Sequence, residues 1–340
     1  MDKPSLDTAK AGAFRFNTDT SQLEIYDGNH WTGVLATSPY QETGGTRGLV
    51  LCGWVGPAVG TMIDIVDVTS GGTANSSHNF GTTIYLGGSC SSRTRGVFGG
   101  GYASGAQDIM HYMNIACEGA AVQFGDLSSN RFGANGGSNG TRGIFFGGST
   151  GPSTSGNGVN NIDYITIATT GLVEDFGDLN YKPCGHSCFN SPTRAFSIGG
   201  TVPGTGYVNT IEYVQTATTG RAANWGDLSI ASGWGAGMSN AVRGVHSLGS
   251  PGYITAIEYA TLSTLGNTKD FGDLTTSLSQ QAPLASPTRI VFCGGVNPSD
   301  NQVGSIDMVE IMSEGDATDF GDLQTARKSM YYCSNGHGGL

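Results

Sequence analysis

One motif recurs six times along the chain. Its core is Thr-Arg-Gly or a close variant, followed by apolar residues and then by one or two glycines. A fixed period is typical of folds built from copies of one structural unit, so the repeat constrains this fold more than any local pattern does. The arginines that mark the copies lie 46 to 52 residues apart, at Arg47, Arg95, Arg142, Arg194, Arg243 and Arg289.

Each unit carries several short strand patterns. After the arginine strand comes a stretch in which apolar and polar residues alternate, as in 162–168 and 211–217, which indicates a β-strand. A weaker stretch, such as 184–189, leads to the next arginine. Between these two stretches, five units contain an aromatic residue followed by Gly-Asp-Leu, with the aspartates Asp126, Asp178, Asp227, Asp273 and Asp322. The sequence therefore predicts about four strands per unit.

Composition supports an all-β fold. The 340 residues include 56 glycines, only 13% are charged and 37% are hydrophobic. Glycine is unfavourable in the interior of a helix, so this composition argues against long helices. The apolar content is nevertheless sufficient for a folded core. Many of the glycines fall at fixed positions of the repeat, which indicates turn chemistry rather than flexibility.

The units resemble kelch repeats of β-propellers. The glycine pair after the second strand and the aromatic residue near the fourth carry this resemblance, together with a tyrosine at Tyr164, Tyr213 and Tyr259. Ile65 and Met308 stand at that place in units 1 and 6. The resemblance implies a six-bladed β-propeller of four-stranded blades over residues 37–340, in which the aromatic residue packs between neighbouring blades.

The two ends of the repeat predict how the ring closes. After the last Gly-Asp-Leu, residues 326–336 form one further strand pattern of the first type, and the corresponding strand before Arg47 is missing. Closure would remove an exposed sheet edge. We therefore expect the C-terminal strand to complete the first blade.

Residues 1–36 do not follow the repeat. Within them, 12–34 alternate strand and turn patterns and predict a short β segment, hairpin-like, that is too small to fold without packing on something else. This segment resembles a motif of tailed-bacteriophage virion proteins, especially tail fibres. The matching positions are Gly12, Phe14, Arg15, Phe16, Asn17, Asp19, Thr20, Leu23, Glu24, Tyr26, Gly28 and Trp31.

The second resemblance implies a virion structural protein on the tail or capsid exterior, assembled in the host cytoplasm, whose partners are other virion proteins. The N-terminal segment would be the attachment motif. Its expected docking residues are Phe14, Arg15, Phe16, Asn17, Tyr26 and Trp31. The sequence leaves open whether the chain forms a homo-oligomer.

The charge distribution argues against several function classes. The net charge is −11 and lysine and arginine do not cluster, which disfavours nucleic-acid binding. The sequence contains no apolar run long enough to predict a membrane-spanning helix. The seven cysteines are scattered through apolar or turn contexts, so we expect most to be reduced and buried.

No catalytic, metal-binding or cofactor-binding constellation stands out, and we predict that the chain is not an enzyme. The repeated aspartates are expected to be structural, accepting backbone N–H groups or pairing with the repeated arginines. The histidines lack the spacing of a metal site, although a propeller would bring His186, Cys188 and His246 toward one axis.

The variable loops that follow the glycine pairs are the candidate recognition surface. Those at 148–158, 201–207 and 296–303 should lie on one face, where Trp54, Tyr207 and Tyr253 could stack against a host-surface glycan. Two alternatives remain: a soluble kelch-like lectin or adaptor, and an enzyme acting on carbohydrate.

Overall fold

The computed structural model describes residues 10–17, 22–33, 45–116, 119–151 and 156–340. The chain divides into two compact units, residues 1–43 and 44–340. The boundary expected between residues 36 and 37 falls in a segment outside the described residues. No helix occurs in the described ranges, and accordingly none of the length and apolarity needed to cross a membrane is found there.

The smaller unit contains one antiparallel sheet in the order β1-β2-β3. Its strands are β1 (Phe14–Asn17), β2 (Gln22–Tyr26) and β3 (Trp31–Gly33). Between β2 and β3, the Asp27 carboxylate accepts the backbone N–H groups of Asn29 and His30, and these hydrogen bonds lower its pKa. The predicted strand-turn-strand pattern of this segment is thereby confirmed for its described residues.

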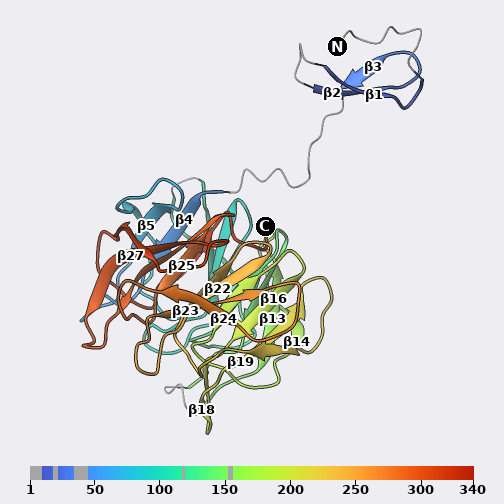
Figure 1. Ribbon diagram of the computed structural model, residues 1–340. Helices are drawn as coiled ribbons and strands as arrows, with labels where there is room; N and C mark the ends of the chain where they lie inside the picture. The colour runs from blue at the N-terminus through green and yellow to red at the C-terminus, as the bar shows by residue number, and fades with distance from the viewer. Residues whose placement is uncertain (1–9, 18–21, 34–44, 117–118, 152–155) are drawn as a thin grey trace. The chain divides into compact units, whose positions relative to one another are not determined.

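The larger unit contains six four-stranded antiparallel sheets, which we number 1 to 6 along the chain (Figure 1). Each sheet has the same order of strands from the inside outward. The innermost strands of sheets 1 to 6 are β29 (Tyr331–Ser334), β7 (Gly88–Ser91), β11 (Asn135–Ser138), β15 (Ser187–Asn190), β21 (Ala236–Ser239) and β25 (Ala282–Ala285).

The second strand of every sheet begins at the repeated arginine, as the motif predicts. These strands are β4 (Arg47–Leu51), β8 (Arg95–Gly99), β12 (Arg142–Phe146), β16 (Arg194–Ile198), β22 (Arg243–Ser247) and β26 (Arg289–Val296). The third strands are β5 (Met62–Asp67), β9 (Ile109–Asn114), β13 (Asn161–Thr166), β19 (Thr210–Gln215), β23 (Ala256–Thr261) and β27 (Gln302–Glu310).

The outer strand ends with the Gly-Asp signal in sheets 2 to 6. The outer strands are β6 (Asn75–Asn79), β10 (Val122–Asp126), β14 (Glu174–Asp178), β20 (Ala223–Asp227), β24 (Lys269–Asp273) and β28 (Thr318–Asp322). A further hairpin, β17 (Thr201–Val202) with β18 (Gly206–Tyr207), projects from the loop of sheet 4.

Strand β29 pairs with β4, with Cys333 opposite Leu49, so the C-terminal strand completes sheet 1 as expected. The innermost strands contact one another in the cyclic order β29, β7, β11, β15, β21, β25 and back to β29. This all-β arrangement of repeated sheets is consistent with a propeller-like fold.

The hydrophobic core is divided into six clusters, each formed where two neighbouring sheets pack face to face. Phe124, for example, lies with Val97 of its own sheet and Phe145 of the next. Both faces of every sheet are therefore covered by protein. The repeated aromatic residue packs between sheets, as the repeat pattern predicts.

Candidate functional site

The six repeated arginines link each sheet to the next. Every guanidinium donates to a backbone carbonyl just beyond the third strand of the following sheet. In sheets 2 to 5 the same guanidinium lies over a tyrosine ring of its own third strand, as with Arg243 at 4.1 Å from the centroid of Tyr259. The acceptor carbonyls, in order from Arg47, belong to Ala116, Ile167 with Ala168, Thr216, Leu262 with Ser263, Ile311 and Thr69.

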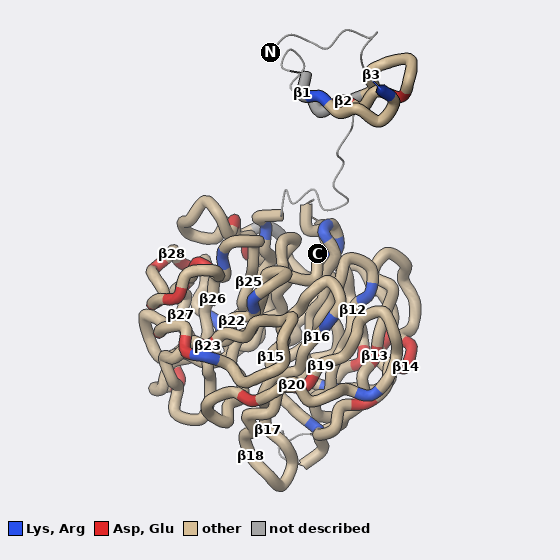
Figure 2. Tube along the Cα trace, turned by 45° about the vertical axis from the view of Figure 1, so that its right-hand side comes forward, with Lys and Arg blue, Asp and Glu red and all other residues tan. Residues whose placement is uncertain are grey.

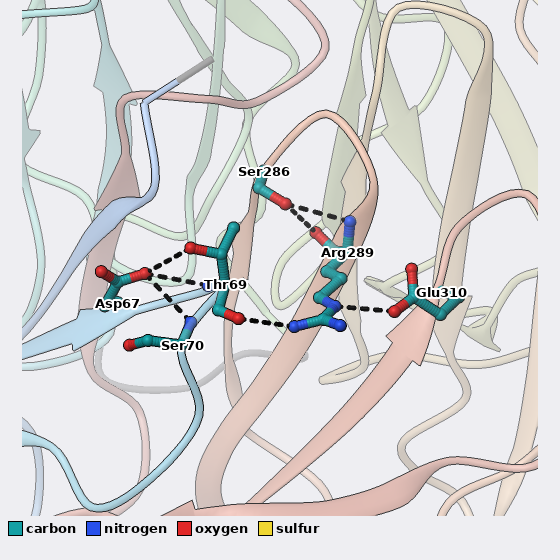
Figure 3. A network of polar contacts seen from close by, with 6 residues as sticks. All are labelled: Asp67, Thr69, Ser70, Ser286, Arg289 and Glu310. Atoms are coloured by element: carbon teal, nitrogen blue, oxygen red, sulfur yellow. Dashed lines mark hydrogen bonds and ion pairs between the residues drawn. The ribbon is translucent and has the colours of Figure 1, made fainter. Parts of the chain in front are cut away.

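The last of these links joins sheet 6 to sheet 1 (Figure 3). Arg289 Nη1 donates to the Thr69 carbonyl over 2.6 Å, and its Nε pairs with Glu310 over 2.7 Å. The Thr69 turn is held by Asp67, which accepts N–H groups from Thr69 and Ser70. Met308 stands here in place of the tyrosine, and the guanidinium is held by its ion pair with the Glu310 carboxylate instead of by a ring.

The aspartates of the Gly-Asp-Leu signal do not pair with these arginines. Among the described residues no ion pair joins the two sets, so that expectation is wrong. The Asp178 carbonyl instead accepts the N–H of Ala222 in the next sheet, and the Phe176 carbonyl accepts that of Gly220. Gly177 has φ +138°, and a Cβ atom there would overlap the Gly220 carbonyl. The glycine of the motif therefore allows the backbones of neighbouring sheets to approach closely enough to form hydrogen bonds.

A second set of carboxylates, not predicted from the sequence, lies on the third strands. All five are 3% exposed or less: Asp64, Asp163, Glu212, Glu258 and Asp307. Each accepts the backbone N–H of the residue that follows Gly-Asp-Leu in the preceding sheet. Two are also paired with a buried arginine, Asp163 with Arg131 and Asp64 with Arg327.

Sheet 2 is the exception. It carries His111 where the other sheets carry a carboxylate, and the preceding sheet has Phe80-Gly81-Thr82-Thr83 in place of Gly-Asp-Leu. The Phe80 and His111 rings meet edge to face, with centroids 5.3 Å apart. The two departures from the repeat thus occur at the same junction, between sheets 1 and 2.

Burial raises the pKa of two of the carboxyl groups that lack an arginine. It is the largest cause raising the pKa of Glu212 and of Asp307, against the hydrogen bonds from Asn180 and Thr275 that lower it. Asp307 accepts both the backbone N–H and the hydroxyl of Thr275. An asparagine at this place could keep both contacts, because a hydroxyl also accepts hydrogen bonds.

We predict that Asp307→Asn removes a pH-dependent loss of stability. The folded-state pKa of Asp307 lies above the unfolded one, so its favourable contribution is complete below the unfolded pKa and is lost as pH rises through the folded pKa. The free energy of unfolding of D307N relative to the unmodified protein should therefore increase in urea titrations as the pH rises above the ordinary aspartate pKa of about 4. Asp270→Asn, at an exposed site, is the control. Equal pH profiles for D307N and the unmodified protein would contradict this assignment.

At the axis, six equivalent residues form a closed cycle of backbone hydrogen bonds. Each N–H donates to the carbonyl of its counterpart in the preceding sheet, over 2.6 to 3.0 Å. All six have φ between 58° and 65°, which is the left-handed region. They precede the innermost strands, at Leu86, Gly133, Gly185, Trp234, Gln280 and Ser329.

The cycle surrounds an axial cavity of about 440 Å³, which includes the open space at its mouth. Its wall contains residues from all six sheets, among them Asn135, His186, Gln281 and Tyr332. A smaller cavity of about 280 Å³ lies among the innermost strands, between Cys90, Cys188 and His337.

Residues 335–340 occupy the axis beyond the smaller cavity. His337 is 3% exposed, and its Nε2 lies 3.2 Å from the Ser91 carbonyl and 3.3 Å from Ser138 Oγ. The Gly338 N–H donates to the Ser239 carbonyl over 2.7 Å. This segment, which we call the plug, hydrogen-bonds to the innermost strands of three sheets. The sequence pattern predicted a strand for its first two residues and no role for residues 337–340.

We predict that Gly339→Ala destabilises the fold by about 1–3 kcal/mol, the usual cost of overpacking. A Cβ atom at Gly339 would overlap the Ser138 carbonyl, which belongs to a buried strand. Gly140→Ala is the matched control, because nothing lies within 4 Å of a Cβ atom there. Denaturant titration measures the free energy of unfolding of both variants. Equal values would show that residues 335–340 can shift to accommodate the methyl group without loss of stability.

The loops after the glycine pairs surround the cavity mouth. Each forms a β-bridge to the residue before one of the six left-handed positions, as Trp54 does to Lys328 and Ser250 does to Gly233. Trp54, Tyr207 and Tyr253, the predicted glycan contacts, are part-buried and lie on loops of sheets 1, 4 and 5. The structure does not bring these three rings into contact with one another.

Trp54 instead begins an aromatic row that the sequence analysis missed. Its ring centroid lies 5.5 Å from that of Tyr85, which lies 5.8 Å from that of Tyr102. Tyr102 in turn meets Phe132 at 5.3 Å. The row spans loops of three sheets beside the cavity mouth.

In the N-terminal unit, three of the six expected docking residues hold the unit itself together. Arg15 pairs with Glu24 over 2.7 Å and lies 4.2 Å from the Trp31 ring centroid. Tyr26 is buried against Trp31. Phe14 is 64% exposed and available for contact. The side chains of Phe16 and Asn17 are outside those described.

The histidines and cysteines do not form a metal centre in the described part of the chain, where no group of three potential ligands was found. His186 and Cys188 line the axial cavities, whereas His246 does not. Six cysteines are buried and free, as predicted, and Cys117 lies outside the described residues.

Figure 2 shows acidic and basic residues interspersed over the larger unit in that view.

Neither the known protein-family models nor the curated proteins contain a match to this chain.

Proposed function

We propose that this chain is a non-enzymatic structural protein of a tailed-bacteriophage virion, displayed on the tail or capsid exterior. In this proposal residues 44–340 are a six-bladed, kelch-like propeller. The cyclic hydrogen bonds at the axis, the arginine links and the β29–β4 pairing support that architecture. A rigid ring of this kind is a scaffold for loops, on which binding residues commonly lie.

The N-terminal unit carries the proposal. It is separate from the repeats, and its internal packing uses the residues that match the phage-fibre motif, Arg15, Tyr26 and Trp31. Phe14 stays exposed on strand β1. A small sheet with an exposed aromatic residue suits docking on another virion protein, because aromatic anchors dominate such interfaces.

The test is incorporation into virions. The full chain and a variant lacking residues 1–44 would be supplied to a phage deleted for the gene, and copies per purified virion would be counted by quantitative mass spectrometry. We expect incorporation of the full chain, loss for the truncated variant and a strong reduction for Phe14→Glu. Thr32→Glu, at another exposed position of the unit, is the control. Absence from virions, or undiminished incorporation of the truncated variant, would overturn the proposal.

The loop face supports a second role, adsorption to host-surface glycans. The row of Trp54, Tyr85 and Tyr102 offers aromatic surface for sugar stacking beside the cavity mouth. Glycan-array binding that falls on Trp54→Ala, Tyr207→Ala or Tyr253→Ala would support this role. Binding without any virion association would favour the alternative of a soluble lectin, and hydrolysis of the glycan would favour a carbohydrate-active enzyme.

A further inference from the structure

The axial cavity holds polar groups that the protein itself leaves without partners. His186 is 3% exposed, and neither of its ring nitrogens has a hydrogen-bond partner within the protein. Gln281, 6% exposed, accepts from Ser247 Oγ through Oε1, but its Nε2 is also unpartnered. Both side chains line the cavity. A buried polar atom left unsatisfied costs about 1–3 kcal/mol, so these groups point to a partner from outside the chain.

The backbone of the cavity mouth is already satisfied. The six N–H groups of the left-handed residues all donate within their cycle, and on the wall Tyr332 Oη donates to Asn135 Oδ1. Recognition in the cavity therefore depends on His186 and Gln281. Three unpartnered nitrogens thus belong to two side chains of one cavity wall, and an unsatisfied buried group in a native structure calls for an explanation.

The charge of the cavity defines the chemistry of its partner. No Asp, Glu, Lys or Arg lines it. Burial and the nearby charge of Arg131 lower the pKa of His186 to about 3, so the ring is neutral near pH 7 and offers one donor and one acceptor. An ionic partner would lose its hydration without gaining a counter-charge. A hydroxyl group, which both donates and accepts, matches the imidazole.

The other side chains of the wall are mixed. Leu86, Ala134, Trp234 and Met330 are apolar or aromatic, whereas Gln280 and Ser329 are polar and hydrogen-bond to each other. A concavity that combines apolar and aromatic walls with a few convergent polar groups is typical of small-molecule sites. A ring with apolar faces and hydroxyl edges fits such a lining, because aromatic side chains pack against its faces.

We propose that the axial cavity is a binding site for an uncharged, hydroxyl-rich ring of monosaccharide size, held by His186 and Gln281 against Trp234. The inference rests on the proposed glycan adsorption for its biological setting, in which the loops would contact the chain and the cavity one terminal sugar. The chemistry is shared by a free sugar and by the end of a glycan.

The experiment titrates neutral and acidic monosaccharides, and then neutral oligosaccharides, into the purified full-length chain near pH 7. Imidazole resonances observed by NMR are the readout. We expect neutral sugars to shift the resonances of His186 and not those of His246, and acidic sugars to shift neither. His186→Leu and Gln281→Leu should each weaken binding at least tenfold, whereas His246→Leu, another fully buried histidine, should not.

Three results would overturn the proposal: no His186 shift with any neutral sugar, binding undiminished in both cavity variants, or a crystal structure in which ordered water alone bridges His186 and Gln281 at saturating sugar. Shifts with monosaccharides alone indicate a free-sugar site, and tighter binding of oligosaccharides indicates a glycan end. The shift is measured on the unmodified chain, so a variant that fails to fold leaves it interpretable. The loop variants test adsorption separately, because Trp54→Ala leaves the cavity intact.

Discussion

Asp64→Ala should destabilise the protein by about 3–5 kcal/mol, the usual effect of removing one partner of a buried ion pair. The Asp64 and Arg327 side chains are both 0% exposed, with Oδ2 and Nη1 3.1 Å apart. Without the carboxylate, the guanidinium would keep its hydrogen bond to the Val50 carbonyl, but its charge would stay buried without a counter-charge. Gln324 would also lose the acceptor of its N–H.

This ion pair joins the segment after sheet 6 to the third strand of sheet 1. The substitution therefore weakens the contact between the first and last sheets of the repeat. Equilibrium urea unfolding followed by tryptophan fluorescence measures the loss of stability. The double variant Asp64→Ala with Arg327→Met should recover most of the stability, because it removes the unpaired charge. Glu310→Ala breaks a pair that is 31% and 45% exposed and should cost no more than about 1 kcal/mol. A double variant as unstable as Asp64→Ala alone would contradict the argument.

The repeated strands were predictable because their signals are local. Arginine and apolar residues mark β12, and alternating residues mark β13, within one unit of sequence. The pairing of β29 with β4 was also predictable, since a unit without its first strand at one end matches a lone strand at the other. In each case residues close in sequence, or the repeat itself, carry the information.

The buried carboxylates were not predictable from alternation. In an isolated sheet Asp163 would lie on the solvent face of β13, but here both faces of each sheet are covered by its neighbours. Ile162 and Asp163 are adjacent, so their side chains point to opposite faces of the sheet, and both are buried. The signal that could have revealed the set is the paired exception, because His111 replaces the carboxylate only where the preceding unit lacks Gly-Asp-Leu.

The axial cavity could not be predicted from the sequence, for a different reason. Its wall takes two or three residues from each of six units, at positions before or at the start of the weakest strand pattern of the repeat. His186 and Gln281 belong to different sheets and lie 95 residues apart in sequence. Only the closure of the ring brings them to one cavity.

Trp225→Ala should cost about 3–5 kcal/mol, the range for truncating a buried large aromatic side chain. Trp225 is 4% exposed and packs edge to face on Phe196, with centroids 4.9 Å apart, and on Tyr213 at 5.7 Å. The Arg194 guanidinium lies 5.5 Å from its ring centroid. Truncation would therefore open a cavity between sheets 4 and 5 and remove one of the two rings that hold Arg194.

The repeat supplies its own control. The other five sheets carry phenylalanine at this position, at Phe80, Phe124, Phe176, Phe271 and Phe320. Trp225→Phe should therefore cost clearly less than Trp225→Ala, because a ring still fills the space and still faces the guanidinium. Urea unfolding of both variants, followed by far-ultraviolet circular dichroism because the substitutions remove a fluorophore, measures the difference. Equal losses would mean that sheet 4 depends on the indole itself, and that the aromatic position is not equivalent around the ring.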